Sequence, residues 1–162
     1  MLPFSVSAHS LTLCASLVQN PMNLGALCRT AEVFGLRELV LPSLQVATTP
    51  EFRRLAVSAH QWQPLTACPV DALPRWLAQQ QHQGAQVVAL TRHVHAVSLP
   101  QFAFPKHTVL LLGRELTGIP APLLTGCDAI VEIPQSGQVD SLNVATAAAI
   151  AAYAYLTQHA TS

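Results

Sequence analysis

Charged side chains are scarce in this sequence. Lysine, arginine, aspartate and glutamate make up 10% of its 162 residues, whereas about 25% is usual for a soluble domain. Hydrophobic residues make up 51%, and the few charged side chains are too few to coat the surface of a monomer comfortably. This composition implies either a large core or a surface covered by another molecule, most simply a second copy of the chain. The length fits one domain, residues 1–162.

Net charge is also absent, because eight basic residues balance eight acidic ones. This balance excludes the global basic field on which strong non-specific nucleic-acid binding depends. The positive charge is nevertheless unusual in kind, since seven arginines stand against a single lysine, Lys106. Arginine carries a planar guanidinium fork that suits a phosphate group.

The cysteines and histidines lack the spacing of metal or redox sites. None of the four cysteines has C-x-x-C spacing, and each lies in an apolar run: Cys14, Cys28, Cys68 and Cys127. This pattern indicates buried, reduced thiols in a cytoplasmic protein. The only close pair of histidines is His93 and His95, so we expect no metal site.

Several sequence signatures of ligand binding and of targeting are missing as well. The glycine-rich dinucleotide fingerprint and the P-loop are both absent, so any phosphate must be bound in another way. The N-terminus has no charged and apolar leader of the secretory kind. The alanine-rich C-terminal segment is interrupted by Asn143 and Thr146 and is too weakly apolar for a membrane span. We therefore expect a soluble protein without a membrane partner.

Short apolar strands alternate with helical patterns along the chain. We expect strands at residues 11–18, 37–41, 63–68, 86–90, 108–112 and 129–133. We expect helices at residues 24–34, 50–60, 72–83, 120–126 and 142–158, and a loop over most of residues 91–105. Asn23 and Asp71 are the expected N-caps of the first and third helices, which Gly35 and Gly84 end. The alternation predicts an α/β fold with a mostly parallel sheet flanked by helices.

The organising stretch of the chain is residues 130–156. It begins as an apolar strand, breaks at Pro134, continues as a polar loop and ends in an alanine-dense helix. Either Ser141 or Asn143 is suited to cap that helix, and both also suit a binding site. Backbone N–H groups at a helix N-terminus are unpaired and the helix dipole is positive there, so capping and binding are compatible.

A binding site is expected where polar loops follow the strands. Ligands of open α/β sheets lie beyond the carboxyl ends of the strands. Three expected strand ends carry polar or glycine-containing loops, at residues 90–91, 113–115 and 134–143. We therefore expect these three loops to form the site.

Three segments carry a family resemblance: NPMNLGALCRTAEVFG (20–35), LLLGRELTGIP (110–120) and VEIPQSGQVDSLNVATA (131–147). In this order they resemble the motifs of the SpoU/TrmH family of RNA ribose 2′-O-methyltransferases, in the SPOUT superfamily. The segment RRLAVSAHQWQPL (53–65) and the form VEIPQSG are similar to one branch of the family. That branch is the C-terminal catalytic domain of the large eukaryotic TAR-RNA-binding-protein-type tRNA methyltransferases. These modify the guanosine at position 18 in the tRNA D-loop and carry a long N-terminal extension. Because the sequence has no comparable extension before its first motif, we expect it to differ from them in substrate recognition more than in chemistry.

The resemblance implies an α/β domain with a deep C-terminal trefoil knot that holds S-adenosyl-L-methionine. It also implies a homodimer with its active site at the subunit interface. By resemblance, the catalytic residues are Asn23, Arg29, Glu115, Ser141 and Asn143, and the cofactor-binding backbone is that of Leu90, Gly113, Ile133 and Leu142. Arg29 is implied to position the substrate ribose and phosphate or to accept the hydroxyl proton; the alternative is a solvated pair with Glu32. Glu115 is implied to orient Arg29 or the neighbouring backbone.

The implied activity is S-adenosylmethionine-dependent 2′-O-methylation of RNA. A tRNA substrate, modified at the D-loop guanosine, is the leading hypothesis. Two alternatives remain open at this point: 2′-O-methylation of another tRNA or ribosomal RNA nucleotide, and a non-catalytic RNA- or cofactor-binding module.

Overall fold

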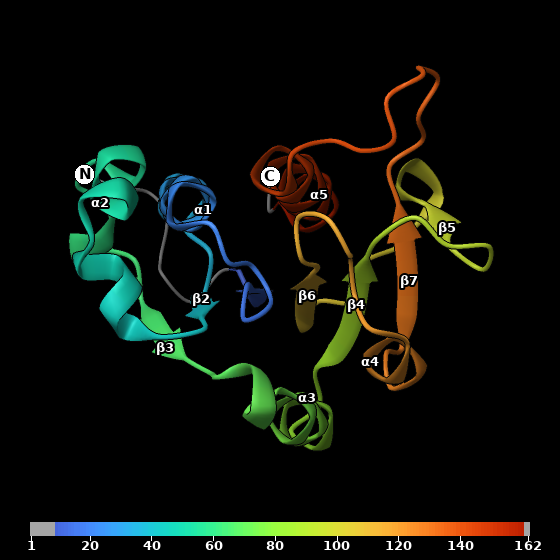
Figure 1. The fold of residues 1–162 in the computed structure, drawn as a ribbon. Helices are drawn as coiled ribbons and strands as arrows, with labels where there is room; N and C mark the ends of the chain where they lie inside the picture. Colours follow the sequence, from blue (N-terminus) through green and yellow to red (C-terminus); the bar gives the residue numbers. More distant parts are fainter. Residues whose placement is uncertain (1–8, 161–162) are drawn as a thin grey trace.

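The computed structural model describes residues 9–160. A seven-stranded sheet forms its centre, in the order β3-β2-β1-β6-β4-β7-β5, and every paired strand runs parallel to its neighbour (Figure 1). The strands are β1 (Leu11–Cys14), β2 (Glu38–Leu41), β3 (Leu65–Ala67), β4 (Gln86–Leu90), β5 (Val97–Ser98), β6 (Thr108–Leu112) and β7 (Ala129–Glu132). The predicted α/β fold with a parallel sheet is confirmed.

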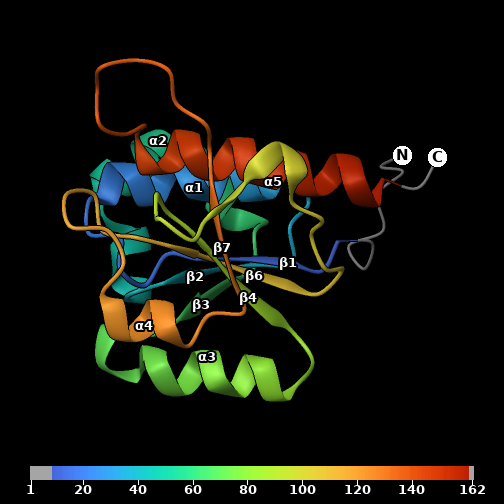
Figure 2. The ribbon, with the colours of Figure 1, turned by 90° about the vertical axis from the view of Figure 1, so that its right-hand side faces the viewer.

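Helices cover both faces of this sheet (Figure 2). One face carries α1 (Pro21–Val33), α2 (Pro50–Ala56) and α5 (Val144–His159). The other face carries α3 (Leu73–His82) and α4 (Ala121–Thr125). Short 3-10 turns lie at residues 44–48, 59–61, 70–72 and 99–101. None of the helices in the described part of the chain combines the length and apolar character that crossing a bilayer requires.

The hydrophobic core lies on both sides of β6, whose five residues are all buried. Alternate side chains of a strand point to opposite faces of the sheet. Leu110 and Leu112 therefore join the cluster beneath α1 and α5, while Val109 and Leu111 join the cluster above α3. This double burial explains why the segment TVLLL is continuously apolar rather than alternating.

The close packing of α1 and α2 depends on Gly25. A Cβ atom at this position would lie 2.2 Å from the carbonyl oxygen of Phe52, which is a severe overlap with backbone. Because glycine lacks this atom, the two helices approach closely, and this packing fixes the position of α1 on the sheet.

Helix α1 begins three residues earlier than the sequence predicted. Its N-cap is Asn20, whose Oδ1 accepts a hydrogen bond of 2.9 Å from the backbone N–H of Met22. Asn23 as the N-cap was therefore wrong, because Pro21 occupies the first helical position, where its fixed φ and missing N–H are tolerated. The side chain of Asn23 is consequently free for other partners. The predicted end of the helix at Gly35, which has φ +64°, is confirmed.

Other boundaries also differ from the prediction. Asp71 does not cap α3, because a 3-10 turn (Val70–Ala72) precedes a helix that begins at Leu73. Strand β1 ends at Cys14 rather than at residue 18, since the chain turns back at Val18, whose N–H donates to Ala15. The expected loop at residues 91–105 contains β5, which pairs with β7.

Helix α5 returns from β7, which is next to the edge strand β5, to the middle of the sheet. It follows β7, yet it packs against α1 and β1. Its last turns are fastened to the segment that precedes β6. The hydroxyl of Tyr155 donates to the carbonyl of Lys106 at 2.6 Å, and Gln158 bonds the backbone of Phe102 and Phe104 at 2.8 and 2.7 Å. Of the two candidate caps, Asn143 is the N-cap of this helix.

Candidate functional site

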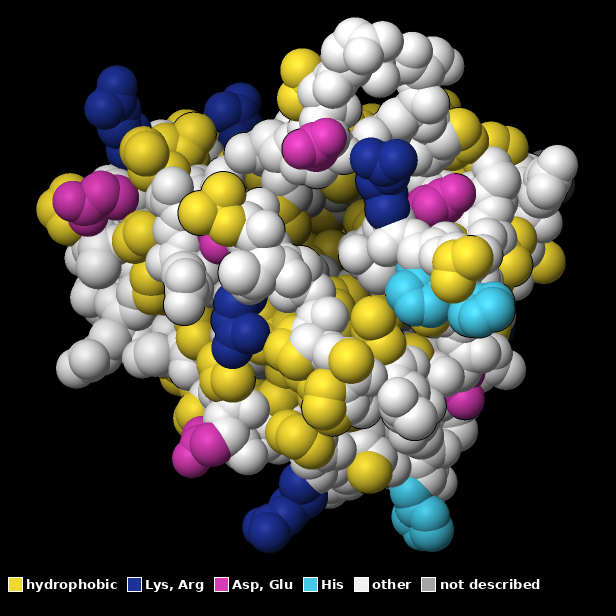
Figure 3. Space-filling view, turned by 45° about the vertical axis from the view of Figure 1, so that its right-hand side comes forward, with side chains coloured by type: hydrophobic (Ala, Val, Ile, Leu, Met, Phe, Trp, Pro, Cys, Tyr) yellow, Lys and Arg dark blue, Asp and Glu magenta, His cyan; other side chains and the backbone are white. Residues whose placement is uncertain are grey.

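A cavity of about 620 Å³ lies beyond the carboxyl ends of β4, β6 and β7. Figure 3 shows a hollow with an apolar floor and with acidic and basic side chains at its rim. The lining consists of residues 90–92, 112–118, 132, 133, 135, 140–144 and 147, together with Asn20 and Asn23. The volume lies within the usual range of small-molecule pockets, which is about 300–1,000 Å³.

The three loops predicted from the sequence meet in this one cavity. Residues 90–91, 113–115 and 140–143 all contribute to its wall, although they follow three different strands. Parallel strands end at the same edge of the sheet, so their loops converge there. The prediction that these loops come together is confirmed.

Glu115 is fixed in the wall of the cavity by the loop that precedes α1. Its Oε1 accepts hydrogen bonds from the backbone N–H groups of Gln19 and Asn20, both at 3.1 Å, and from Nδ2 of Asn23 at 3.5 Å. Burial acts to raise the pKa of this carboxyl, but the hydrogen bonds, led by that from Asn20, outweigh burial and lower it. Glu115 is therefore an ionised carboxylate held through its Oε1, and its lowered pKa makes it an anchor rather than a strong base.

Asn23 connects this carboxylate to the start of α5. Its Oδ1 accepts a hydrogen bond of 2.9 Å from Nδ2 of Asn143, while its own Nδ2 faces Glu115. The Oδ1 of Asn143 accepts from the backbone N–H groups of Ala145 and Thr146 at 2.9 and 3.2 Å. Asn143 thus caps α5 and holds α1 at the same time, so the predicted compatibility of capping with a site role has a geometric basis.

The loop between β6 and α4 is closed by its own backbone. Arg114 and Gly118 exchange two N–H to carbonyl hydrogen bonds, of 3.0 and 3.1 Å. Gly118 has φ +72°, a left-handed conformation that favours glycine. A Cβ on Gly113 would lie 2.8 Å from the carbonyl carbon of Gly118, so only glycine fits there. This closure presents residues 114–117 rigidly toward the cavity.

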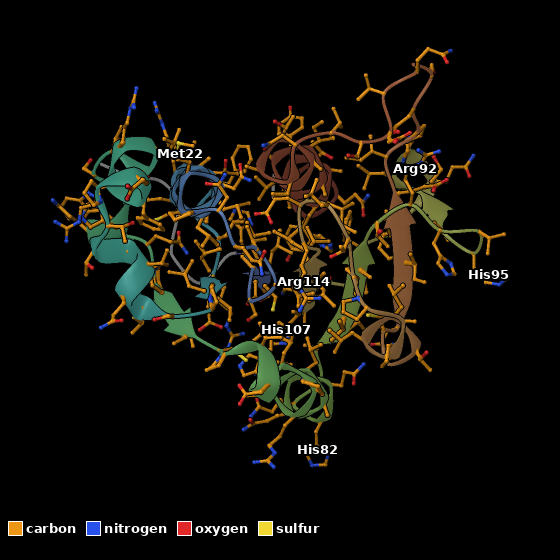
Figure 4. The ribbon with its side chains drawn as sticks, in the orientation of Figure 1. Met22, His82, Arg92, His95, His107 and Arg114 are labelled. Atoms are coloured by element: carbon orange, nitrogen blue, oxygen red, sulfur yellow. The ribbon has the colours of Figure 1, made fainter. Side chains whose placement is uncertain are left out.

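The last loop, residues 135–143, is held over the cavity by Arg92. The Nη1 of Arg92 donates to the carbonyl oxygen of Asp140 at 2.9 Å. Ser141 and Leu142 follow directly, line the cavity and are exposed at its mouth. Figure 4 shows Arg92 beside the upper end of β7 and Arg114 near β6, so two arginines reach the cavity from different loops.

The structure brings eight of the nine predicted site residues to this cavity. They are Asn23, Leu90, Gly113, Glu115, Ile133, Ser141, Leu142 and Asn143. The ninth, Arg29, is exposed on α1 and does not line this cavity. Within residues 9–160 the Arg29 side chain makes neither a hydrogen bond nor an ion pair, so the group that it binds stays a prediction.

Several residues of the wall were not predicted from the sequence, Asn20 and Arg92 among them. Asn20 lines the cavity and was not expected there, although asparagine before proline suits a helix cap. Arg92 directly follows the strand end at Leu90 and Thr91. Its position just beyond a strand of a parallel sheet was the available signal.

Comparison with known proteins identifies the family. Residues 10–153 match the SpoU rRNA Methylase family. The chain is 42% identical over 152 residues to the Mus musculus tRNA (guanosine(18)-2'-O)-methyltransferase TARBP1, a match that covers 94% of this chain and 10% of that protein. The chain thus spans about a tenth of the length of this curated relative.

Two solved structures share the fold at similar identity. An AdoMet-bound rRNA methyltransferase from Sinorhizobium meliloti superposes with a TM-score of 0.80 and 30% identity, over 94% of this chain and 56% of that one. A structure described as giving insight into the 2-OH methylation of C/U34 on tRNA has a TM-score of 0.77 and 30% identity, over 94% of this chain and 97% of that one. The three motifs that line the cavity lie inside the matched region. The chain therefore belongs to the SpoU rRNA methylase family, as the resemblance predicted.

Proposed function

We propose that this chain is an S-adenosyl-L-methionine-dependent RNA ribose 2′-O-methyltransferase that acts on tRNA, at guanosine 18. The observation that carries the proposal is the cavity beyond the strand ends, in whose wall Glu115, Asn23 and Asn143 form one hydrogen-bonded chain. It is supported by family membership and by the 42% identity to a tRNA (guanosine(18)-2'-O)-methyltransferase.

The cavity fits S-adenosyl-L-methionine in size and in chemistry. Its volume of about 620 Å³ accommodates a nucleoside with an amino-acid tail. Leu90, Ile133 and Leu142 offer apolar surface for an adenine ring, and the strand ends beside them offer backbone donors and acceptors. Gly113 brings the backbone close without a side chain. The bound cofactor would supply a methyl group carried on a sulfonium.

The residues of the chain have to orient a ribose 2′-hydroxyl. This hydroxyl forms the new O–C bond while the C–S bond breaks, and its proton leaves at the same time. We assign the positioning of the ribose to Ser141 and Asn143, which lie at the mouth of the cavity. We assign to Glu115 the anchoring of Asn23 and of the loop at 113–118, because its pKa is lowered and its Oε1 already accepts hydrogen bonds from the loop before α1.

A homodimer completes this site. The outward face of α1 carries Met22, Arg29 and Val33, which recur at helical spacing, and Met22 and Val33 are 45% and 66% exposed. The neighbouring face of α5 carries Ile150 and Tyr153, which are 41% and 61% exposed. Figure 4 shows Met22 on the side of α1 that is directed away from the sheet. Such an apolar face suits a second copy of the chain.

In this dimer Arg29 of one protomer would act in the cavity of its partner. Arg29 lies outside its own cavity and is surrounded on the helix surface by the apolar residues of the proposed interface. A guanidinium stays protonated at neutral pH, so its role is to hold the substrate phosphate rather than to accept a proton.

We further propose that residues 1–162 form one cytoplasmic domain with a C-terminal trefoil knot. A cytoplasmic location is supported by four free cysteines. The knot is supported by the path of α5, which follows β7 and then lies hydrogen-bonded against residues 102–106. A crystal structure tests it: a backbone that pulls straight when its two ends are drawn apart would contradict the knot.

The proposed activity is tested by incubating the protein with methyl-labelled cofactor and total RNA from the source cell, then mapping the label by mass spectrometry. We expect a 2′-O-methylguanosine in tRNA. A nucleotide of the anticodon loop is the second candidate, because the C/U34 structure matches this chain over 97% of its own length. Label in neither RNA class, with no heat of cofactor binding in calorimetry, would leave the non-catalytic module as the function.

A further inference from the structure

A second cavity adjoins the first on the far side of the loop between β6 and α4. It is open, has a volume of about 630 Å³ and is lined by residues 19–21 and 114–117. Asn20 and residues 114–117 line the first cavity as well. The loop at 113–118 is therefore a wall shared by the two neighbouring cavities. The proposed cofactor occupies only the first cavity, so the second needs another ligand.

Arg114 supplies the positive charge of this shared wall. Its backbone is fixed by the two hydrogen bonds to Gly118. Within the described residues its guanidinium makes no hydrogen bond and no ion pair, although the side chain is half-buried. Because the backbone of the loop is already fixed, binding of an anion restricts mainly the rotamers of the arginine side chain, and the planar fork keeps that cost per hydrogen bond low.

The neighbouring carboxylate does not neutralise Arg114. Glu115 is turned toward Gln19, Asn20 and Asn23, from which it accepts its hydrogen bonds. The other side chains of the second cavity are neutral, so no acidic group competes for the guanidinium there. Leu116, at the tip of the loop, is 98% exposed and adds an apolar surface beside the charge.

We propose that the second cavity binds a phosphodiester of the substrate RNA strand, held by Arg114, next to the nucleotide whose ribose enters the first cavity. The guanidinium fork matches two oxygens of a phosphate, and the exposed Leu116 offers a surface for a ribose or base. The inference rests on the proposed function and adds to it a phosphate-binding residue within the same protomer, separate from Arg29.

One other anion is within the reach of Arg114. Because Arg114 lines the first cavity too, the carboxylate of the cofactor is an alternative partner. The two anions are distinguished by measuring RNA binding and cofactor binding separately.

The test compares Arg114→Gln and Arg114→Lys with Arg75→Gln in the full chain. Arg75 is an exposed arginine on α3, which covers the face of the sheet opposite α1 and α5. The substitution Arg75→Gln therefore removes the same charge at a distant place. An unmodified tRNA transcript is titrated at several salt concentrations without cofactor, and S-adenosyl-L-methionine is titrated without RNA.

We expect Arg114→Gln to weaken tRNA binding about tenfold or more and to lower the salt slope by about one, as the loss of one charged phosphate contact should. Its cofactor Kd stays unchanged, and its KM for tRNA rises more than its kcat falls. Arg114→Lys keeps the salt slope, and Arg75→Gln behaves like the wild type.

Unchanged tRNA affinity and salt slope in Arg114→Gln would overturn the inference. A weaker cofactor affinity with unchanged tRNA affinity would also overturn it, because this result would assign Arg114 to the carboxylate of the cofactor. A wild-type protein that does not bind tRNA would overturn it as well. Failure of the proposed function has a different signature: the wild type binds tRNA but neither binds the cofactor nor transfers a methyl group.

Discussion

Asn143 donates a hydrogen bond of 2.9 Å from its Nδ2 to the Oδ1 of Asn23, joining two helices whose residues are 120 positions apart in the chain. Asn23 also donates from its Nδ2 to Glu115, and Asn143 also accepts from the backbone N–H of Ala145 in the first turn of α5. The position of α1 relative to the cavity is thereby tied to the cap of α5. A substitution at one end of this hydrogen-bonded chain should therefore alter the geometry at the other end.

Substitutions of Asn143 separate its two contacts. Asn143→Ala removes the cap of α5 as well as the bond to Asn23, and we expect it to lower the free energy of unfolding by about 0.5–2 kcal/mol. Asn143→Ser keeps a capping oxygen but lacks the Nδ2 donor. It should therefore retain most of the stability and still lose methylation activity. Urea unfolding and steady-state kinetics check this pair; full activity in Asn143→Ser would show that the bond to Asn23 is dispensable.

Glycine positions in the site loops give a matched comparison. A Cβ on Gly113 would lie 2.8 Å from backbone of Gly118, whereas a Cβ on Gly137 would meet nothing within 4 Å. We expect Gly113→Ala to lower the free energy of unfolding by about 1–3 kcal/mol through overpacking and to weaken cofactor binding. Gly137→Ala should change neither quantity. Equal behaviour of the two variants in thermal unfolding and calorimetry would contradict the closed geometry of the loop.

The carboxylate of Glu115 makes stability dependent on pH in a defined direction. Its pKa is lowered in the folded state, so the charged form stabilises the fold. This contribution is fully present above the unfolded-state pKa of about 4.3 and is lost as the pH falls through the folded-state pKa. We therefore expect Glu115→Gln to be less stable than the wild type at pH 7. The difference should shrink as the pH falls below the unfolded-state pKa and on through the lowered folded-state pKa, because the wild-type side chain then becomes protonated too. A difference that stays constant from pH 7 to pH 3 in urea unfolding would be incompatible with this assignment.

Arg29 is expected to act across the proposed dimer interface. Arg29→Ala should lower kcat/KM for tRNA about a hundredfold or more, since misplacing the substrate is that costly, while cofactor affinity stays unchanged. Arg75→Ala is the matched control on the opposite face of the sheet. Mixing Arg29→Ala with Asn143→Ala, each inactive alone, should restore activity in heterodimers that contain one intact site. If heterodimers verified by tagging stay inactive, Arg29 acts in the cavity of its own protomer rather than in that of its partner.

The sheet was predictable because its strands are short, apolar and separated by helical patterns. The continuous TVLLL run of β6 indicated burial on both faces, and that burial is what the structure has. The boundaries were less predictable, because local caps compete. Asn20 and Asn23 are equally good capping residues, and only the position of Pro21 within the first turn decides between them. Strand β5 has two residues, too few to show any period.

The meeting of three loops in the site was predictable, but their contacts were not. A parallel sheet dictates that the ends of β4, β6 and β7 share an edge. Nothing in the local sequence dictates that Glu115 bonds the backbone of Gln19, or that Asn143 finds Asn23, because those contacts depend on strand order. The proposed role of Arg29 depends further on the proposed second copy of the chain, which no local sequence pattern places.

The most direct test of the central claim is methyl transfer to a tRNA that carries either guanosine or 2′-deoxyguanosine at position 18. The deoxy substrate differs only in lacking the hydroxyl that the proposed reaction methylates. We predict stoichiometric transfer of label from S-adenosyl-L-methionine to the first tRNA and none to the second. Equal labelling of both tRNAs, or of neither while the cofactor is bound, would contradict 2′-O-methylation of this guanosine.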